Sequence, residues 1–328
     1  MREVAERAGV AMSSVSRVLS EHPDVSEGMR LAVMTAVDEL GYRPDLLAQG
    51  LRRQRTMSVG FTVSDISNPV LASAVTGAER RLREAGYSLL LTNSEGDPEL
   101  DAKNIGLLEQ RRVDGLILSL AEEHHVATAA ALGAVEIPVV LLDRDPTPGL
   151  VASRVSFDHR SGMAAATRHL VELGHREVAL ITGGPRRPAR ERRLGVEETL
   201  AGAANGRCSL FEGEFSIEHG YRAALAILDE RRATAVIAGG NVLMQGALRA
   251  FHERGVTVGA DISFIGCDDV AVAELHSPQI AVVGRDMEAL GMSGAELLLD
   301  QLAGASGPGE LILPTAFVAR PSCAPPLA

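Results

Sequence analysis

The chain has 328 residues, of which 46% are hydrophobic and 23% are charged, and its formal net charge is −11. This composition is that of an ordinary globular protein, and the length is enough for two or three domains. The apolar runs are all shorter than the roughly 18 to 20 residues of a membrane span. Because the first residues also lack the apolar segment of a signal peptide, we expect a cytoplasmic protein with no membrane contact.

The three cysteines, Cys208, Cys267 and Cys323, are an odd number without CxxC spacing. This usage is typical of reduced thiols and not of a disulfide framework or a zinc site. The adjacent His124 and His125 resemble a metal pair, but neighbouring positions on a helix point about 100° apart. We therefore expect no metal and no cofactor.

The charge is unevenly distributed along the chain. Up to Thr56 there are eight arginines and eight acidic residues, so the whole excess of negative charge lies beyond that segment. Arg52, Arg53 and Arg55 form a basic cluster at the end of it. A neutral segment with focused arginines on an acidic body is compatible with DNA binding.

The first 43 residues predict three short helices. The first covers residues 3–8 and is interrupted by a glycine. The second covers 12–19, where Val15, Val18 and Leu19 have the i, i+3, i+4 spacing of one narrow apolar face. Two short helices joined by a tight turn that contains glycine, followed by a third that closes the core, are the pattern of a helix-turn-helix domain.

The third helix is predicted from its two ends. It begins after Ser26, a residue type that caps helix N-termini, and it ends at Gly41. The apolar residues expected in its buried face are Val33, Met34, Val37 and Leu40. Residues 45–55 follow; they are helical in residue type but too few for a helix that is stable alone.

From residue 58 onward, apolar runs rich in β-branched residues recur with helix-like segments between them. The runs are SVGFTV, SLLLT, GLILSL, PVVLLD, VALITGG, AVIAGG, ISFIGCDD and IAVVG. Continuous apolar runs, as opposed to alternating ones, are typical of parallel strands buried on both faces. The fold class is therefore α/β, with a doubly wound body whose length suits two subdomains.

The motifs of common α/β enzymes are missing. No GxGxxG opens a helix after the first strand, no GxxxxGK[ST] occurs, and there is no GxSxG elbow. These absences count against a dehydrogenase, a P-loop enzyme and a hydrolase. The TGGP stretch at 182–185 could bind an anion, although glycines after a strand usually only make a turn.

Taken together, the motifs resemble one family over the entire chain, the LacI/GalR family of bacterial transcription regulators. The matching stretches occur in family order and spacing: VAERAGVAMSSVSRVLS, VSEGMRLAVMTAVDELGYRPDLLAQGLR, VGFTVSDISNPV, EAGYSLLLTNS, QRRVDGLIL, PVVLLDR, HLVELGHREVALITG, GADISFIGCDD and RPSCAPP. The resemblance implies a DNA-binding headpiece, a hinge helix, and a two-lobed body of periplasmic-binding-protein type that dimerises and holds an effector between its lobes.

In that family the second helix enters the major groove of DNA. The resemblance makes Met12, Ser13 and Arg17 the residues that face base edges, with Ser14 and Ser16 toward phosphates. The physical chemistry agrees, because an arginine can fork onto guanine and small hydroxyls can donate to phosphates without holding the helix away from the groove.

The resemblance extends to the hinge. Leu51 matches the family's leucine that wedges into the minor groove, with Ala48 beside it, and such a wedge bends the DNA. Gly50 departs from the pattern, at a cost of about 1 kcal/mol in helix propensity relative to alanine. Arg30 and Arg52 are also expected to contact DNA.

For the effector, Arg192 and Asp268 fall at polar pocket positions of the family, where an arginine and a carboxylate can hold vicinal hydroxyls between them. The DISNPV stretch places further candidates at the mouth of the cleft. These are Asn68, Val70 and Leu71, and Asn241 is added from the second lobe.

Some positions depart from the family pattern. Gly240 stands where an amide-bearing residue usually holds the ligand, and Asn241 replaces an aspartate. Val70 and Leu71 replace a frequent aromatic pair, so a standard hexose that stacks on aromatic rings is less expected. The chain also begins a few residues later than is usual, which suggests a natural start upstream of Met1.

The sequence thus predicts a regulator, expected to be a repressor and not an enzyme, that binds a near-palindromic operator as a homodimer or tetramer under control of a sugar or sugar derivative. The alternatives are a solute-binding protein without DNA function and an α/β sugar-modifying enzyme. The expected divisions are a headpiece at 1–43, a linker with the hinge helix at 44–57, and a core at 58–328, with one subdomain of about 58–156 and 285–316 and another of about 157–284 and 317–328.

Overall fold

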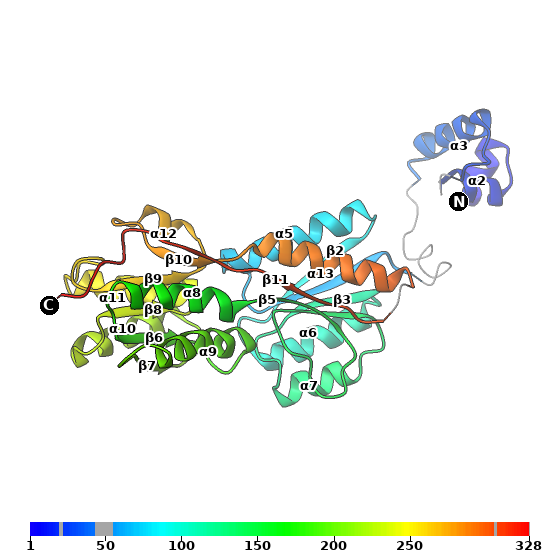
Figure 1. The fold of residues 1–328 in the computed structure, drawn as a ribbon. Coiled ribbons are helices and arrows are strands. Elements are labelled where there is room, and N and C mark those ends of the chain that lie inside the picture. Colours follow the sequence, from blue (N-terminus) through cyan, green and yellow to red (C-terminus); the bar gives the residue numbers. More distant parts are fainter. Residues whose placement is uncertain (20–21, 43–54, 305–306, 328) are drawn as a thin grey trace. The chain divides into compact units, whose positions relative to one another are not determined.

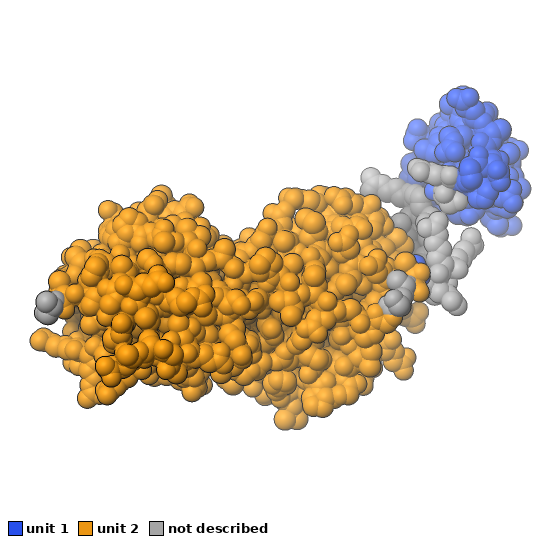
Figure 2. Space-filling model, viewed as in Figure 1, with its two compact units in different colours: residues 1–56 blue, residues 57–328 orange. Residues whose placement is uncertain are grey.

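The computed structural model describes residues 1–19, 22–42, 55–304 and 307–327. The chain forms two compact units, residues 1–56 and residues 57–328, which Figure 2 shows in different colours. Within the described ranges, no helix combines the length and the apolar character that a bilayer span requires.

The first unit is a bundle of three short helices, α1 (Arg2–Ala8), α2 (Met12–Leu19) and α3 (Glu27–Leu40). The Ser26 side chain accepts a hydrogen bond from the backbone N–H of Met29 at the start of α3, and Gly41 ends the helix in a left-handed conformation with φ 57°. Both ends of the helix are therefore where the sequence predicted them.

The core of this unit is smaller than expected. Val33 and Ala36 of α3 are buried together with residues of α1 and α2. Met34 and Leu40, which we expected in the core, are 42% and 44% exposed, and that expectation was wrong. The reason is geometric: α3 contacts two helices of only seven and eight residues, which cover a narrow strip of its surface.

The second unit contains two lobes, each with a six-stranded sheet (Figure 1). The first sheet has the order β11-β5-β4-β3-β1-β2, and its strand pairs are parallel. Its strands are β1 (Ser58–Val63), β2 (Ser88–Asn93), β3 (Gly115–Ser119), β4 (Val139–Leu142), β5 (Ser153–Phe157) and β11 (Glu310–Leu313). One face packs on α5 (Pro69–Glu84) and α13 (Met287–Leu302), and the other on α6 (Pro98–Gln110) and α7 (Val126–Gly133).

The second lobe repeats this architecture with the order β12-β10-β9-β8-β6-β7, in which only β12 is antiparallel to its neighbour. Its strands are β6 (Glu177–Thr182), β7 (Arg207–Glu212), β8 (Ala235–Ala238), β9 (Ser263–Cys267), β10 (Ala281–Gly284) and β12 (Ala316–Val318). The covering helices are α8 (His159–Glu172) and α9 (Arg187–Ala201) on one face and α10 (Ile217–Glu230) and α11 (Asn241–Glu253) on the other; a short α12 (Ala271–Leu275) follows β9.

The chain passes between the lobes three times, after β5, after β10 and after β11. Each lobe is therefore assembled from segments that are far apart in the sequence. The predicted fold class is confirmed: an N-terminal helix-turn-helix headpiece is followed in the chain by an α/β body of two doubly wound subdomains.

Helices α5 and α13 pack so closely that two glycines are required. A Cβ atom on Gly77 would lie 2.1 Å from the carbonyl oxygen of Glu288, and one on Gly291 would lie 1.8 Å from that of Ala74. The obstacle is backbone in both cases, and backbone cannot swing aside as a flexible side chain can.

We expect Gly291→Ala to lower the stability of the second unit by at least about 2 kcal/mol, because the added methyl group forces the helices apart. Thermal unfolding followed by circular dichroism measures this as a fall in Tm of about 4 °C or more. Gly106→Ala is the control, since Gly106 lies inside α6 with nothing within 4 Å of the added atom, and it should leave Tm unchanged or raise it. An equal fall in both variants would contradict the packing argument.

Candidate functional site

The first candidate surface is the outer side of α2 in the headpiece. Val15 and Val18 are buried, whereas Met12, Ser13 and Arg17 are exposed, with Ser13 and Arg17 on the side of the helix opposite the valines. Ser14 and Ser16 are partly buried at its borders, and Arg30 is half-buried on α3. The predicted DNA-facing residues of α2 thus share one solvent-facing surface. The predicted hinge residues Ala48, Leu51 and Arg52 lie outside the described residues.

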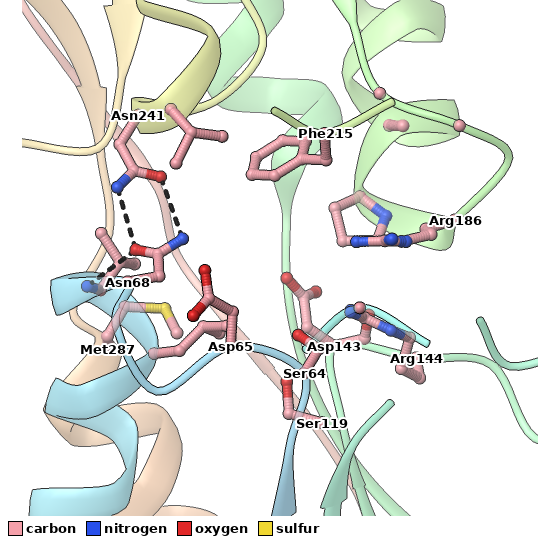
Figure 3. Close-up of a pocket in the computed structure, with 18 of the residues that line it drawn as sticks. Ser64, Asp65, Asn68, Ser119, Asp143, Arg144, Arg186, Phe215, Asn241 and Met287 are labelled. Atoms are coloured by element: carbon pink, nitrogen blue, oxygen red, sulfur yellow. Dashed lines mark hydrogen bonds between the residues drawn. The ribbon is translucent and has the colours of Figure 1, made fainter. Parts of the chain in front are cut away.

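The second candidate site is a cavity of about 160 Å³ between the two lobes of the body (Figure 3). One water needs roughly 10 to 15 Å³ on the same measure, so the cavity has room for a small polar molecule the size of a monosaccharide. Of the residues predicted for the effector, five line it: Asn68, Val70, Leu71, Arg192 and Asn241.

Asn68 and Asn241 bridge the lobes at one side of this cavity. Asn68 caps the N-terminus of α5 in the first lobe, and Asn241 is the first residue of α11 in the second. Each side-chain amide donates to the other's carbonyl oxygen, with N···O distances of 3.3 and 2.9 Å (Figure 3). The pair is almost fully buried, so the two lobes are hydrogen-bonded to each other across the cavity.

Asp268, which the sequence predicts to contact the effector, is not among the residues that line the cavity. It is buried, and its Oδ1 accepts a hydrogen bond from Nε of Arg285 at 2.6 Å. Arg285 is the cavity-lining residue of this pair. Asp268 follows β9 in a left-handed conformation, which directs its carboxylate toward the crossover segment after β10.

The carboxylate of Asp143, directly after β4, is the centre of a buried network at the same junction. It contacts Nε2 of His159 at 2.8 Å, a guanidinium nitrogen of Arg285 at 3.1 Å and one of Arg187 at 3.3 Å. Burial alone would raise the pKa of Asp143, but the adjacent His159 and Arg285 hold it well below its usual range. Its partners therefore favour the ionised form of Asp143.

His159 is held as a neutral imidazole. Its Nδ1 accepts from Nε of Arg192 at 3.3 Å, so Nε2 carries the proton and donates to Asp143. Burial lowers the pKa of His159 to about 4, although the charge of Asp143 acts in the opposite direction. Arg192 also donates to the carbonyl oxygen of Gly239, and these two bonds fix its side chain at the cavity wall.

Phe215 lines the cavity from the second lobe and was not predicted from the sequence. Its ring occupies the space beside two glycines. A Cβ atom on Gly240 would lie 2.1 Å from the ring, and one on Gly183 would lie 2.7 Å from it. The sequence signal was Gly240 itself, the position where a larger residue is missing and whose space the aromatic ring fills.

Glu123, His124 and Asp145 lie close enough together to hold a metal ion. The two carboxylates, however, already have cationic partners: Glu123 pairs with Arg144, and Asp145 pairs with Arg154, Arg187 and Arg190. We therefore interpret the two carboxylates as members of ion pairs and not as metal ligands. His125 has another role, since its Nδ1 accepts from the backbone N–H of Ala127 at the start of α7.

Two family models match the chain. Residues 1–45 match the bacterial regulatory proteins of the lacI family, and residues 167–323 match the periplasmic binding protein-like domain. The chain is 31% identical to the HTH-type transcriptional repressor PurR of Proteus mirabilis, over 92% of this chain and 90% of the relative. It is also 31% identical to the ribose operon repressor of Escherichia coli, over 92% of both chains.

Solved structures give the same result for the complete fold. A crystal structure of the Lac repressor dimer bound to operator and the anti-inducer ONPF is similar with a TM-score of 0.85 and 28% identity, with 98% of each chain covered. The complex of the transcriptional regulator CelR with cellobiose has a TM-score of 0.73 and 31% identity over 98% of each chain.

The helix-turn-helix headpiece and the cavity between two periplasmic-binding-protein-like lobes define an effector-controlled transcription regulator. With the identities just given, the chain belongs to the lacI family of bacterial regulatory proteins, and the resemblance found in its motifs is confirmed.

The pKa of His159 makes stability depend on pH in a defined direction. The folded pKa of about 4 lies below the ordinary value of 6.5, so between these values the unfolded chain binds a proton that the folded chain does not. Stability therefore falls as the pH is lowered through this window, with this residue contributing up to about 1.4 kcal/mol per pH unit. In His159→Gln this contribution should vanish, and urea unfolding at pH 6.5, 5.5 and 4.5 measures the difference in slope.

His124→Gln serves as the control, because His124 is exposed. It should keep the wild-type dependence on pH. If wild type and His159→Gln lost stability at the same rate, His159 would not be the group that takes up the proton.

Proposed function

We propose that this lacI-family regulator is a repressor that binds a near-palindromic operator as a homodimer, and that a sugar or sugar derivative in the interlobe cavity controls its affinity for DNA. It acts in the cytoplasm, where its DNA is, and it is not an enzyme. The observation that carries the DNA-binding part is the two-sided character of α2, with Val15 and Val18 in the core and Met12, Ser13 and Arg17 in solvent.

Each residue of that surface has a role in the proposal. Arg17 forks onto the O6 and N7 atoms of a guanine, a contact worth about 1 to 3 kcal/mol of discrimination against other bases. Met12 and Ser13 face neighbouring base edges, and Ser14, Ser16 and Arg30 contact phosphates. Ala48 and Leu51 of the segment 44–57 contact the minor groove at the operator centre, and Arg52 contacts phosphates.

The relatives support the assembly. The Lac repressor structure is a dimer bound to its operator. A two-fold symmetric dimer presents two α2 helices to two half-sites, and for this reason the operator is expected to be near-palindromic. We also propose the domain divisions 1–43, 44–57 and 58–328 as functional ones, for DNA reading, linkage and effector control.

The cavity supports the control of DNA binding by an effector. It is lined from both lobes, which are connected by three crossover segments and by the amide pair of Asn68 and Asn241. A ligand that hydrogen-bonds to either asparagine competes with the hydrogen bonds between the two amides and so changes the contact between the two lobes. By linkage, effector and operator then alter each other's affinity by one common factor.

Removal of the predicted base-reading charge tests the proposal. We expect Arg17→Ala to lower the affinity for a selected operator by about tenfold or more while it retains most of the affinity for random DNA. The operator is first selected from a random pool with the wild-type protein, and gel-shift titrations over a range of salt concentrations then give both affinities. The wild type should lose affinity with salt at a slope set by the number of phosphates that it neutralises.

Arg7→Ala is the matched control, because Arg7 lies on α1 of the same unit and pairs with Glu39 of α3. It removes the same charge and should preserve the preference for the operator. An equal loss of affinity on all sequences in Arg17→Ala would make Arg17 a phosphate contact, and the absence of any preferred sequence for the wild type would refute operator binding.

A further inference from the structure

We propose that the effector is an anionic sugar-sized molecule, a sugar phosphate or a sugar acid, and that Arg186 and Arg144 bind its oxyanion. The inference rests on the proposed effector control and specifies the chemical class of the ligand. It follows from how the cationic groups around the cavity are used by the protein itself.

Arg186 is the cation that the protein leaves available. It lines the cavity, and its guanidinium makes no hydrogen bond and no ion pair with any other residue in the part of the chain that the structure describes. Burial and the positive charge of Arg144 lower the pKa of Arg186 to about 10, and the carboxylates of Glu123, Asp101 and Glu122 only partly offset this. Arg186 is partly buried beside a second cation, and an added anion would stabilise this arrangement.

Arg144, the second arginine of the proposal, is held in place by hydrogen bonds to the backbone. Only 7% of its side chain is exposed, and its Nε donates to the carbonyl oxygen of Leu120 at 2.7 Å while another nitrogen donates to that of Asp143 at 2.9 Å. Its contact with Glu123 is longer, at 3.5 Å. These bonds hold the guanidinium at the cavity wall on the same side as Arg186 (Figure 3).

The other two arginines of the cavity are already occupied. Arg285 is bound by the carboxylates of Asp143 and Asp268, and Arg192 donates to His159 and to the carbonyl oxygen of Gly239. An anion in the cavity therefore finds its first partner at Arg186, with Arg144, which also pairs with Glu123, beside it.

The backbone favours an anion at the same end. Arg186 is the N-cap of α9, a helix of 15 residues, and Pro188 and Ala189 of its first turn line the cavity. The backbone N–H of Arg187 already donates to the carboxylate of Glu123 at 2.9 Å, so the helix acts on an anion in the cavity through its dipole and not through that donor. The positive end of the helix dipole adds to the two guanidinium charges.

The opposite side of the cavity is suited to hydroxyl groups. Asn68 and Asn241 lie across from Arg186 in Figure 3, and the carboxylate of Asp65 lies between these two sides. Side-chain amides can both donate hydrogen bonds to hydroxyls and accept them, and a carboxylate can accept them. The cavity is thus polar in a directional way, with an oxyanion end and a hydroxyl end, and its volume fits one sugar ring with a charged substituent.

The test uses the full chain and matched ligands at constant ionic strength: ribose, ribose 5-phosphate and ribonate; glucose, glucose 6-phosphate and gluconate; and inorganic phosphate alone. At a hundredfold excess over Kd, a bound anionic member should raise Tm by about 3 °C or more while its neutral counterpart leaves Tm unchanged. Phosphate and carboxylate members are compared to distinguish the two sources of the oxyanion. Calorimetric titration then gives Kd for the active compound.

Arg186→Gln should weaken the anionic ligand by about tenfold or more, since a charge-assisted hydrogen bond is lost. Arg193→Gln is the control, because Arg193 lies on the same helix, pairs with Glu197 and does not line the cavity; it should retain wild-type binding. Inorganic phosphate should produce a smaller shift that Arg186→Gln also abolishes.

Two results would overturn the inference: neutral sugars that bind as well as their anionic counterparts, or anionic ligands whose affinity Arg186→Gln leaves unchanged. Neither result touches the proposed function, because a neutral effector could still control DNA binding. The proposed function fails separately, in the gel-shift titration, if the wild type prefers no DNA sequence.

Discussion

The buried carboxylate of Asp143 is the interaction on which the geometry of the body depends. It follows β4 of the first lobe, and its partners come from three other places: His159 at the start of α8, Arg187 at the start of α9, and Arg285 on the crossover segment after β10. A charge that is fully removed from water must be matched by hydrogen-bonded partners, or its burial would be strongly unfavourable. The requirement fixes these segments of both lobes around one point, and this point is also a wall of the cavity.

The same network explains which cavity residues are available to a ligand. Arg285 and Arg192 line the cavity, but their hydrogen bonds are directed at Asp143, Asp268, His159 and a backbone carbonyl. Both side chains line the site and contribute positive potential, but their guanidinium groups already donate hydrogen bonds to groups of the protein. Arg186, whose guanidinium has no such bond among the described residues, is left to determine the charge of the molecule that enters. The ring of Phe215 occupies the space that a side chain at position 240 would fill, and it gives one wall of the cavity an aromatic surface.

The secondary structure shows where sequence patterns are reliable. The eight apolar runs identified in the sequence correspond to β1, β2, β3, β4, β6, β8, β9 and β10. The strands that were not identified are β5, β7, β11 and β12; the last three lie at sheet edges, and β5 contains two serines and an arginine. Edge strands are covered on fewer sides and tolerate polar residues, so they can lack the long continuous apolar run of a central strand, although β2, also an edge strand, has one. In the headpiece the ends of α3 were predicted from Ser26 and Gly41, whereas the burial of Met34 and Leu40 was not predicted correctly.

The sequence by itself determined the family, the fold class, the central strands and the two-sided helix α2, because each depends on local periodicity, capping residues or motifs that are contiguous in the chain. It also indicated five of the residues that line the cavity. Only the tertiary structure decided that Asp268 serves Arg285, that Asn68 and Asn241 bond to each other, and that Phe215 and Arg186 line the site. These facts depend on contacts between residues as many as 173 positions apart, brought together by chain crossings between two lobes. Such contacts follow from the packing of the whole body and leave no local pattern in the sequence.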